Sequence, residues 1–326
     1  MTGYVVGRIL WTLPVLWAIA TVTFLLMHTV EGGPYASEKP VPPRIEEALN
    51  AKYNLDKPLA EQYVLYFRDL SRLDLGISFR TGNIEVRELL AQGLPVSIQL
   101  GVVGFVYAVV VGMTLGIVAA LNQNRAADYF GVFFATVGTA MPNFIIASFL
   151  VIIFSVQLGW FDVLGWGGPQ WELGDPTTWV RNFNPFEWNY RKVVLPTIAL
   201  GTLSASYIAR ITRASMLEVL QQDYVRTARA KGLTERAVIA RHTMKNAMVP
   251  ILTVMGPIFV ALVTGSFIVE RIFAINGIGR HFVTAVFTRD YGVIMGTTLL
   301  YTLLVATANL LIDISYGFVD PRIRYR

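Results

Sequence analysis

The residue types that most often carry out enzymatic chemistry are scarce in this sequence. Its three histidines, His28, His242 and His281, do not form an H-x-x-x-H pattern, and it contains no cysteine. It also lacks the G-x-x-x-x-G-K-[ST] pattern that holds nucleotide phosphates. A membrane enzyme would need paired acids or a Ser–His set, whereas His28 and Asp313 are predicted at opposite faces of the membrane. We therefore expect a non-enzymatic chain that holds no metal and no cofactor itself.

Charged residues inside apolar segments are the remaining candidates for a functional site. Asp313 lies within the last apolar segment, and an acid inside a membrane normally requires a partner. Arg210 lies in an earlier segment at a similar predicted depth, so the two could form an intramembrane ion pair. In the alternative interpretation, Asp313 has no such partner, lies at the membrane–water interface and extends its side chain to water.

The composition indicates that membrane-spanning helices position these residues. Of 326 residues, 54% are hydrophobic and 15% are charged, whereas about a quarter are charged in soluble domains. Six segments can cross about 30 Å of hydrocarbon at about 1.5 Å per helical residue. They are residues 9–30, 96–121, 129–158, 193–216, 247–269 and 293–318. We interpret the first as a retained helix, because it is too long for a signal peptide.

The chain is thus predicted to be an all-α polytopic membrane protein in three parts. These are the N-terminus with the first helix (1–30), an external subdomain (31–95) and a five-helix core (96–326). In the external part, one helix would begin at Pro43 and another at Pro58, each with an apolar stripe to bury. The stripes are Ile45, Leu49 and Tyr53, and then Leu59, Tyr63, Phe67 and Leu70. In the alternative interpretation, these two helices lie in the lipid headgroup layer and do not form a packed subdomain.

The charge distribution predicts the orientation. With both termini on one side, that side carries 13 Lys or Arg and six acids, and the other carries 14 and 16. Because Lys and Arg concentrate on the cytoplasmic side near the ends of spans, we expect both termini in the cytoplasm.

A basic loop connects the fourth and fifth spans. Residues 210–245 contain eight Lys or Arg and three acids. Residues 216–231 have helical periodicity, Gly232 ends that helix, and Thr234 can cap the next one. We therefore predict a short helix–turn–helix corner at residues 217–246.

Three interpretations of this corner compete. A basic loop beside the membrane contacts anionic lipid in many proteins. DNA binding is disfavoured, because both ends are tethered to the bilayer and a third helix is missing. In the third interpretation, the corner is a rigid contact for a soluble motor protein.

The loop resembles the EAA-type coupling loop of ABC importer permeases, specifically of the dipeptide/oligopeptide permease family. The similarity lies in residues 223–233, DYVRTARAKGL, and 241–247, RHTMKNA. Further blocks follow the family's order: LDLGISFRTG (73–82), LPT (195–197), GIGR (277–280) and DPR (320–322). The general motif has Glu and Ala where this chain has Arg226 and Thr227, and proline is common at the positions of Lys245 and Asn276.

The resemblance implies a permease subunit of an importer in a bacterial or archaeal cytoplasmic (inner) membrane. Its partners would be a second homologous permease subunit, two cytoplasmic ATP-binding subunits and an extracytoplasmic substrate-binding protein. ATP and Mg would bind to the ATPase subunits, membrane lipid would surround the spans, and no nucleic acid partner is expected. A self-contained secondary transporter is the alternative, although inverted repeats and paired broken helices are not evident.

The resemblance also assigns roles to residues of the corner. We expect the contact with the ATPase to be made by Tyr224, Ala228, Gly232 and Leu233. We expect Arg226, Arg229 and Lys231 to be charges at its rim.

Small, polar and proline residues within the spans are candidates for the translocation pathway, although such residues more often mark helix packing. The candidates are Pro142, Asn143, Gly256, Thr264, Ser266 and Asn309. The expected substrates are di- and oligopeptides. The same family also includes permeases for nickel, glutathione, opines and oligosaccharides.

Overall fold

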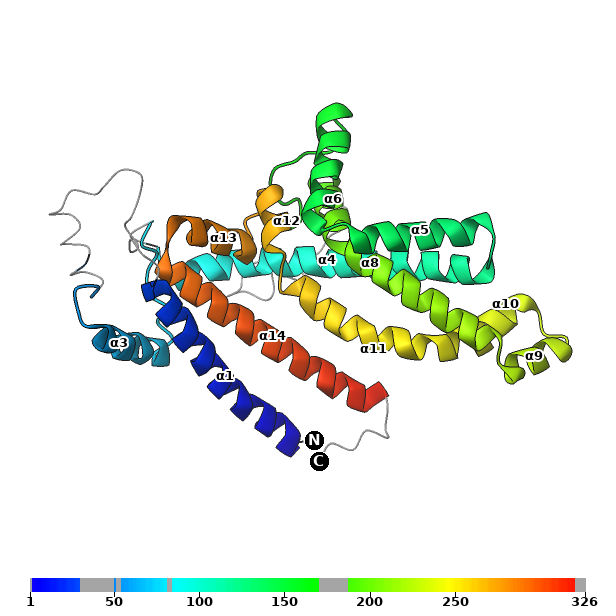
Figure 1. Cartoon of the computed structure of the whole chain (residues 1–326), viewed down its shortest axis with the longest axis horizontal. Helices are drawn as coiled ribbons and strands as arrows, with labels where there is room; N and C mark the ends of the chain where they lie inside the picture. The colour runs from blue at the N-terminus through cyan, green and yellow to red at the C-terminus, as the bar shows by residue number, and fades with distance from the viewer. Residues whose placement is uncertain (1, 30–49, 51–53, 81–83, 170–186, 320–326) are drawn as a thin grey trace. The chain divides into compact units, whose positions relative to one another are not determined.

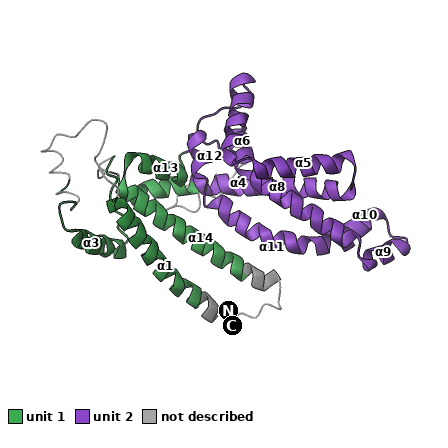
Figure 2. Cartoon of the chain, in the orientation of Figure 1, with its two compact units in different colours: residues 1–95, 171–180, 276–326 green, residues 96–170, 181–275 purple. Residues whose placement is uncertain are grey.

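The computed structural model describes residues 2–29, 50, 54–80, 84–169 and 187–319. This part of the chain is helical, with one isolated β-bridge between Ile77 and Glu85. The chain forms two compact units (Figure 2). Unit 1 contains residues 1–95, 171–180 and 276–326, and unit 2 contains residues 96–170 and 181–275. This division differs from the predicted parts, because residues 276–326 group with the N-terminal residues and not with the core.

The described residues contain five helical stretches that are long and apolar enough to cross a membrane. They are Val6–Thr29, Val86–Leu121, Tyr190–Leu220, Glu235–Ile272 and Tyr291–Ile314. Helices α5 (Ala126–Ala140) and α6 (Asn143–Leu150), with the π-helical segment Val151–Gln157, form a bent pair that makes a sixth crossing if counted as one span. The all-α membrane fold is therefore confirmed.

In unit 1, helix α1 (Thr2–Thr29) runs alongside α14 (Tyr291–Val319), and α13 (Ile278–Thr288) also packs on α14 (Figure 1). Helix α3 (Leu59–Ser71) begins directly after Pro58, as predicted. Tyr63 and Tyr66 of α3 pack on the buried ring of Phe24 in α1, with centroids 5.5 and 5.7 Å away. Leu59 of the predicted stripe is exposed instead. The helix predicted to begin at Pro43 lies outside the described residues.

A buried carboxylate fixes the loop that precedes α4 (Val86–Leu121). Asp290, 3% exposed, lies just before α14 and accepts hydrogen bonds from Ser78 Oγ and from the amides of Phe79 and Arg80. The guanidinium of Arg80 donates to the carbonyl of Thr288, 3.1 Å away. Residues 78–80 are thereby attached to the junction of α13 and α14.

Unit 2 is built around helix α8 (Tyr190–Leu220), which packs on α5, α6 and α11 (Met244–Val263). In its most apolar stretch, 67% of residues are buried, against 11–33% in the other spanning stretches. Glycines let α4 approach it closely. A Cβ on Gly112 would lie 2.6 Å from the carbonyl oxygen of Ala205, and one on Gly116 would lie 2.6 Å from that of Ala209. Close backbone approach through small residues is typical of membrane helix pairs.

Two predicted spans are interrupted. The third bends by 109° between α5 and α6. Met141 adopts an extended conformation there (φ −94°, ψ 123°), because the ring of Pro142 disfavours a helical residue before it. The fifth predicted span, 247–269, crosses a break after Val263, where Gly265 has φ +93° and Ser266 caps helix α12 (Phe267–Ile272).

Candidate functional site

The corner between the fourth and fifth spans consists of short helices joined by tight turns. Helix α8 ends at Leu220, α9 comprises Asp223–Ala230, and α10 (Glu235–Ala237) continues through a π-helical turn into α11. The periodic helix predicted for residues 216–231 is therefore interrupted at Gln221 and Gln222. Gly232 has φ +79°, the left-handed conformation that ends a helix, and its amide donates to the carbonyl of Arg229 at 2.9 Å. The predicted turn at Gly232 is confirmed.

The corner has a small apolar interior of its own. Val225 and Val238 are 0% exposed, Ala228 is 5% exposed, and Val219 packs against this cluster. The prediction that Ala228 lies on the contact surface is wrong, because its side chain is enclosed by the loop. Ala228 can shape the corner, but its side chain cannot reach a partner without unfolding it.

Two polar contacts brace the corner. The guanidinium of Arg229 donates to both carboxylate oxygens of Glu235, at 2.7 and 3.1 Å, across the turn at Gly232. This hydrogen bonding raises the pKa of Arg229 above its ordinary value. The side-chain amide of Asn246 donates to the hydroxyl of Tyr224 at 2.6 Å. Neither partner was predicted from the sequence.

The outer surface of the corner combines two apolar side chains with cations. Tyr224 is 41% exposed and Leu233 is 43% exposed. Arg226 and Lys231 are exposed as well. This surface, defined here as the knob, consists of Tyr224, Arg226, Lys231 and Leu233. A helix held rigid from within, carrying exposed apolar side chains between cations, has the properties of a docking element.

The charged residues of the spans have different partners from those predicted. Asp313 of α14 pairs with Arg8 of α1, with 2.5 Å between Nη2 and Oδ2, in place of the predicted Arg210. Arg213 of α8 makes two hydrogen bonds to the buried carboxylate of Asp128 in α5, at 2.5 and 2.8 Å. Arg210 lies over the ring of Tyr207, 5.5 Å from its centroid. The Asp128–Arg213 pair could have been found by asking which acids directly border apolar segments, because Asp128 precedes the segment 129–158.

The predicted pathway residues divide into structural and exposed positions. Pro142 and Ser266 precede helices at breaks, and buried Thr264 donates to the carbonyl of Val260 at 2.9 Å. Asn143 has a buried Oδ1 atom without a hydrogen-bond partner. Gly256 lies half-buried within α11, and Asn309 is exposed on α14.

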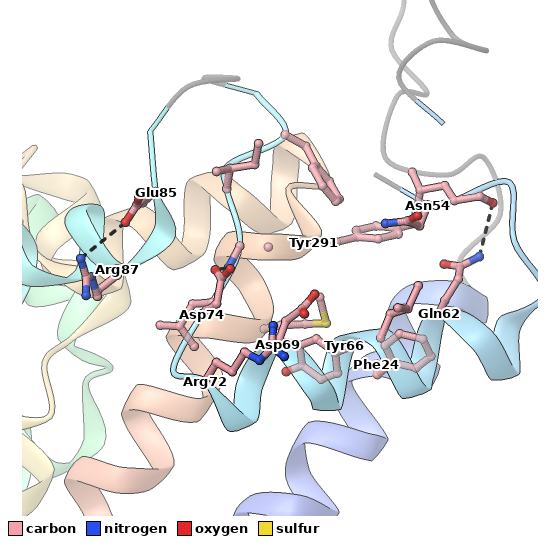
Figure 3. Close-up of a pocket in the computed structure, with 18 of the residues that line it drawn as sticks. Phe24, Asn54, Gln62, Tyr66, Asp69, Arg72, Asp74, Glu85, Arg87 and Tyr291 are labelled. Carbon is pink, nitrogen blue, oxygen red and sulfur yellow. Dashed lines mark hydrogen bonds and ion pairs between the residues drawn. The ribbon is translucent and has the colours of Figure 1, made fainter. Parts of the chain in front are cut away.

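Unit 1 contains a pocket of about 530 Å³. Figure 3 shows that acidic and basic side chains, including Asp69, Arg72 and Asp74, surround it together with the rings of Tyr66 and Tyr291. The Tyr66 hydroxyl is buried without a partner, and burial raises the pKa of Tyr66 to about 12. The pocket therefore offers both signs of charge and aromatic surface to a ligand.

Comparison with protein families identifies the chain. Residues 112–325, which include the corner and its knob, match the family model described as binding-protein-dependent transport system inner membrane component. The chain belongs to this family. It is a multi-pass membrane subunit of the ABC permease type, and the predicted family is confirmed.

Curated relatives match this permease from end to end. It is 39% identical over 325 residues to the oligopeptide transport system permease protein OppB of Haemophilus influenzae, with all of both chains covered. It is 38% identical over 324 residues to the dipeptide transport system permease protein DppB of Bacillus subtilis, with 99% of this chain and 98% of the relative covered.

Solved ABC transporters share the fold of the permease. An inward-facing structure of the methionine ABC transporter MetNI gives a TM-score of 0.54 at 15% identity, over 71% of this chain and 96% of that one. An amino acid ABC transporter structure gives a TM-score of 0.51 at 17% identity, and the match covers 70% of this chain and 93% of that one.

Proposed function

We propose that this permease is one subunit of an ATP-driven importer for di- and oligopeptides. Its full-length similarity to relatives named as oligopeptide and dipeptide permeases carries the proposal. The bound peptide would cross the membrane through a pathway that this chain forms with a second, homologous permease subunit. An extracytoplasmic binding protein would deliver the peptide.

We infer that the knob couples the pathway to ATP hydrolysis by two cytoplasmic ATPase subunits, which bind ATP and Mg. A motor can bias a membrane-embedded element only through a contact whose affinity differs between its states. The knob suits this role because its exposed Tyr224 and Leu233 can fill an apolar groove. Arg226 and Lys231 would meet acidic groups at the rim, and Arg229, held by Glu235, would keep the turn rigid.

The coupling role requires the corner to lie in the cytoplasm, together with both chain termini. The excess of Lys and Arg on that side supports this orientation. In this orientation the pocket of unit 1 would lie at the outer face, because the N-terminus of α1 would be inside and the pocket residues Phe24 and His28 lie near the other end of the helix.

The test is purification of the complex from its native membrane in mild detergent, followed by reconstitution with the binding protein. Co-purifying chains are identified by mass, and ATP-dependent uptake of a labelled dipeptide is measured. Gly232→Pro serves as the uncoupled variant, because proline cannot adopt φ +79° and lacks the amide that bonds Arg229. Gly232→Asn is the matched control, because asparagine tolerates the left-handed conformation.

We expect a second permease and ATPase chains to co-purify with the wild type, and peptide uptake to require ATP. Gly232→Pro should lose uptake, and Gly232→Asn should keep most of it. Uptake by this chain alone without nucleotide would overturn the proposal in favour of a secondary transporter. ATP-dependent uptake of nickel, glutathione or an oligosaccharide, and not of peptides, would overturn the substrate class alone.

A further inference from the structure

One face of helix α8 remains uncovered between residues 203 and 218, where the other positions are buried or half-buried. The exposed positions between residues 203 and 218 follow one another at intervals of four, three, four and four residues, which places them on a single side of the helix. This stripe consists of Leu203, Tyr207, Arg210, Ala214 and Glu218.

The stripe differs in chemistry from surfaces suited to lipid. Most exposed large side chains of α1 are Val, Ile, Leu and Trp, and those of α5 include Phe130, Val132 and Phe133. The exposed arginine and tyrosine of these two helices, Arg8 and Tyr129, lie within the first two turns. The stripe instead has a tyrosine and an arginine in its middle. Since ionisable residues within spans face a bundle interior or a watery cavity, this face is unsuited to hydrocarbon.

Arg210 is the charge that the surrounding helices leave unneutralised. It lies ten residues before the end of α8, which is about 15 Å along the helix. Within the described part of the chain it forms no ion pair, whereas Arg213, one turn away, is held by Asp128. The ring of Tyr207 supports the guanidinium from one side, 5.5 Å from its centroid. The donors of Arg210 therefore remain available to an anion.

A cavity of about 290 Å³ lies beside Arg210, between α4, α5 and α8. Small residues line it, including Gly116, Gly131 and Ala135, and Thr136 and Thr139 line it as well. Each hydroxyl donates to a carbonyl of its own helix at 2.8 Å, to Val132 and Ala135 respectively, so its oxygen can still accept a hydrogen bond. Arg213 also lines the cavity, but Asp128 neutralises it. Within the described residues, the cavity thus combines one cation that forms no ion pair, Arg210, with two acceptors.

We propose that the stripe lines the translocation pathway and that Arg210 binds the C-terminal carboxylate of the passing peptide. This inference rests on the proposed function. A guanidinium presents parallel donors that match the two oxygens of a carboxylate. The hydroxyl oxygens of Thr136 and Thr139 would accept hydrogen bonds from the nearby peptide amide. Every unmodified linear peptide carries this carboxylate whatever its side chains, so the site recognises the class without selecting a sequence.

The experiment compares uptake of a dipeptide with uptake of its C-terminal amide by proteoliposomes that hold the complete transporter and binding protein. The ratio of the two rates is measured for wild type, Arg210→Gln and Arg210→Lys. Lys192→Gln, which removes a cation elsewhere on α8, is the matched control. Because the binding protein is the same throughout, a change in the ratio reports on the permease. Gel filtration and basal ATP hydrolysis show whether each variant assembles.

We expect wild type to favour the free carboxylate, and Arg210→Gln to lower the ratio about tenfold, the size typical of one lost charge-assisted hydrogen bond. Arg210→Lys should retain part of the preference, and Lys192→Gln all of it. An equal loss of both rates in Arg210→Gln would overturn the proposal and assign Arg210 to assembly with the partner permease. The proposal would also be overturned if both uptake rates of Arg210→Gln equalled those of wild type, or if they varied only with the anionic phospholipid content of the liposomes. Either result would indicate an arginine that faces lipid. Absence of ATP-dependent peptide uptake by the wild type would instead refute the proposed function, and this inference with it.

Discussion

At the scale of single residues, burial decides which side chains of the corner can contact a partner. Ala228 and Val225 point into the loop, whereas Tyr224, one residue from Val225, is exposed. Ala228 was expected at the contact from the family resemblance, and the helical spacing of residues 216–231 was counted along one continuous helix. Helix α8 stops at Leu220 and α9 starts anew at Asp223, so the helical phase is lost between them. A contact prediction from periodicity requires an unbroken helix.

Enlarging Ala228 should disrupt the corner from within. Ala228→Leu adds three carbons to a site that is 5% exposed, and overpacking of this kind costs about 1–3 kcal/mol. Limited proteolysis of the detergent-solubilised chain should then cut between residues 217 and 246. Ala230→Leu, two residues along α9 at an exposed position, is the matched control and should stay resistant. Equal resistance of both variants would show that the interior has room for the larger side chain.

The ion pair between Arg8 and Asp313 should link α1 to α14. Replacing either residue by its neutral amide leaves the other charge without this partner, so Arg8→Gln and Asp313→Asn should each lower the thermal unfolding midpoint. The double variant should lose less than the two single losses combined. Because half of the Arg8 side chain is exposed, the coupling should be at most about 1 kcal/mol. If the loss in the double variant equalled the sum of the two single losses, the two charges would act independently.

At the scale of elements, the sequence predicted where helices cross the membrane better than where they break. Long apolar runs identify spans by length alone, and Gly232 with Thr234 predicted the turn of the corner. The 109° bend at Pro142 exceeds the kink that a proline predicts by itself, because Met141 leaves the helical conformation completely. The partner of Asp313 was not predictable, because Arg8 lies 305 residues away and meets it only through packing of α1 on α14.

The carboxylate of Asp290 should hold residues 78–80 in place. Asp290→Asn replaces one acceptor oxygen by a donor and removes the negative charge, with an expected cost of about 1–3 kcal/mol. Hydrogen exchange at the amides of Phe79 and Arg80 should accelerate, since both donate to this carboxylate. Ser78→Ala removes a single bond and should have a smaller effect. If hydrogen exchange at these amides is equally fast in both variants, the bonds from the amides of Phe79 and Arg80 to Asp290 add nothing to the bond from Ser78.

At the scale of the whole molecule, the absence of cysteine makes the topology directly testable. A single cysteine at Lys57, before α3, or at Lys231, in the corner, introduces the only thiol of the chain. With six crossings the two positions are separated by three spans and must lie on opposite sides. A membrane-impermeant maleimide should label Lys57→Cys in right-side-out vesicles and Lys231→Cys in inverted ones.

The same experiment decides whether the bent pair crosses the membrane. If α5 and α6 enter and leave by the same face, two spans separate the positions, and both thiols react from one side. Reversed labelling of the two positions would contradict the orientation deduced from the charges while keeping the number of crossings.

The bend at Met141 and Pro142 bears on how the chain is made. Residues 129–158 leave the ribosome before α8 exists, and insertion into the bilayer favours a continuous helix, whose backbone groups bond to one another. In the bent form both α5 and α6 pack on α8, and α6 also packs on α12. A Cβ on Gly138 of α5 would collide with the side chain of Ser206, so α5 and α8 touch there. We therefore expect the third segment to enter the membrane straight and to fold over only after the fourth has arrived, which makes the bend a late event of biogenesis.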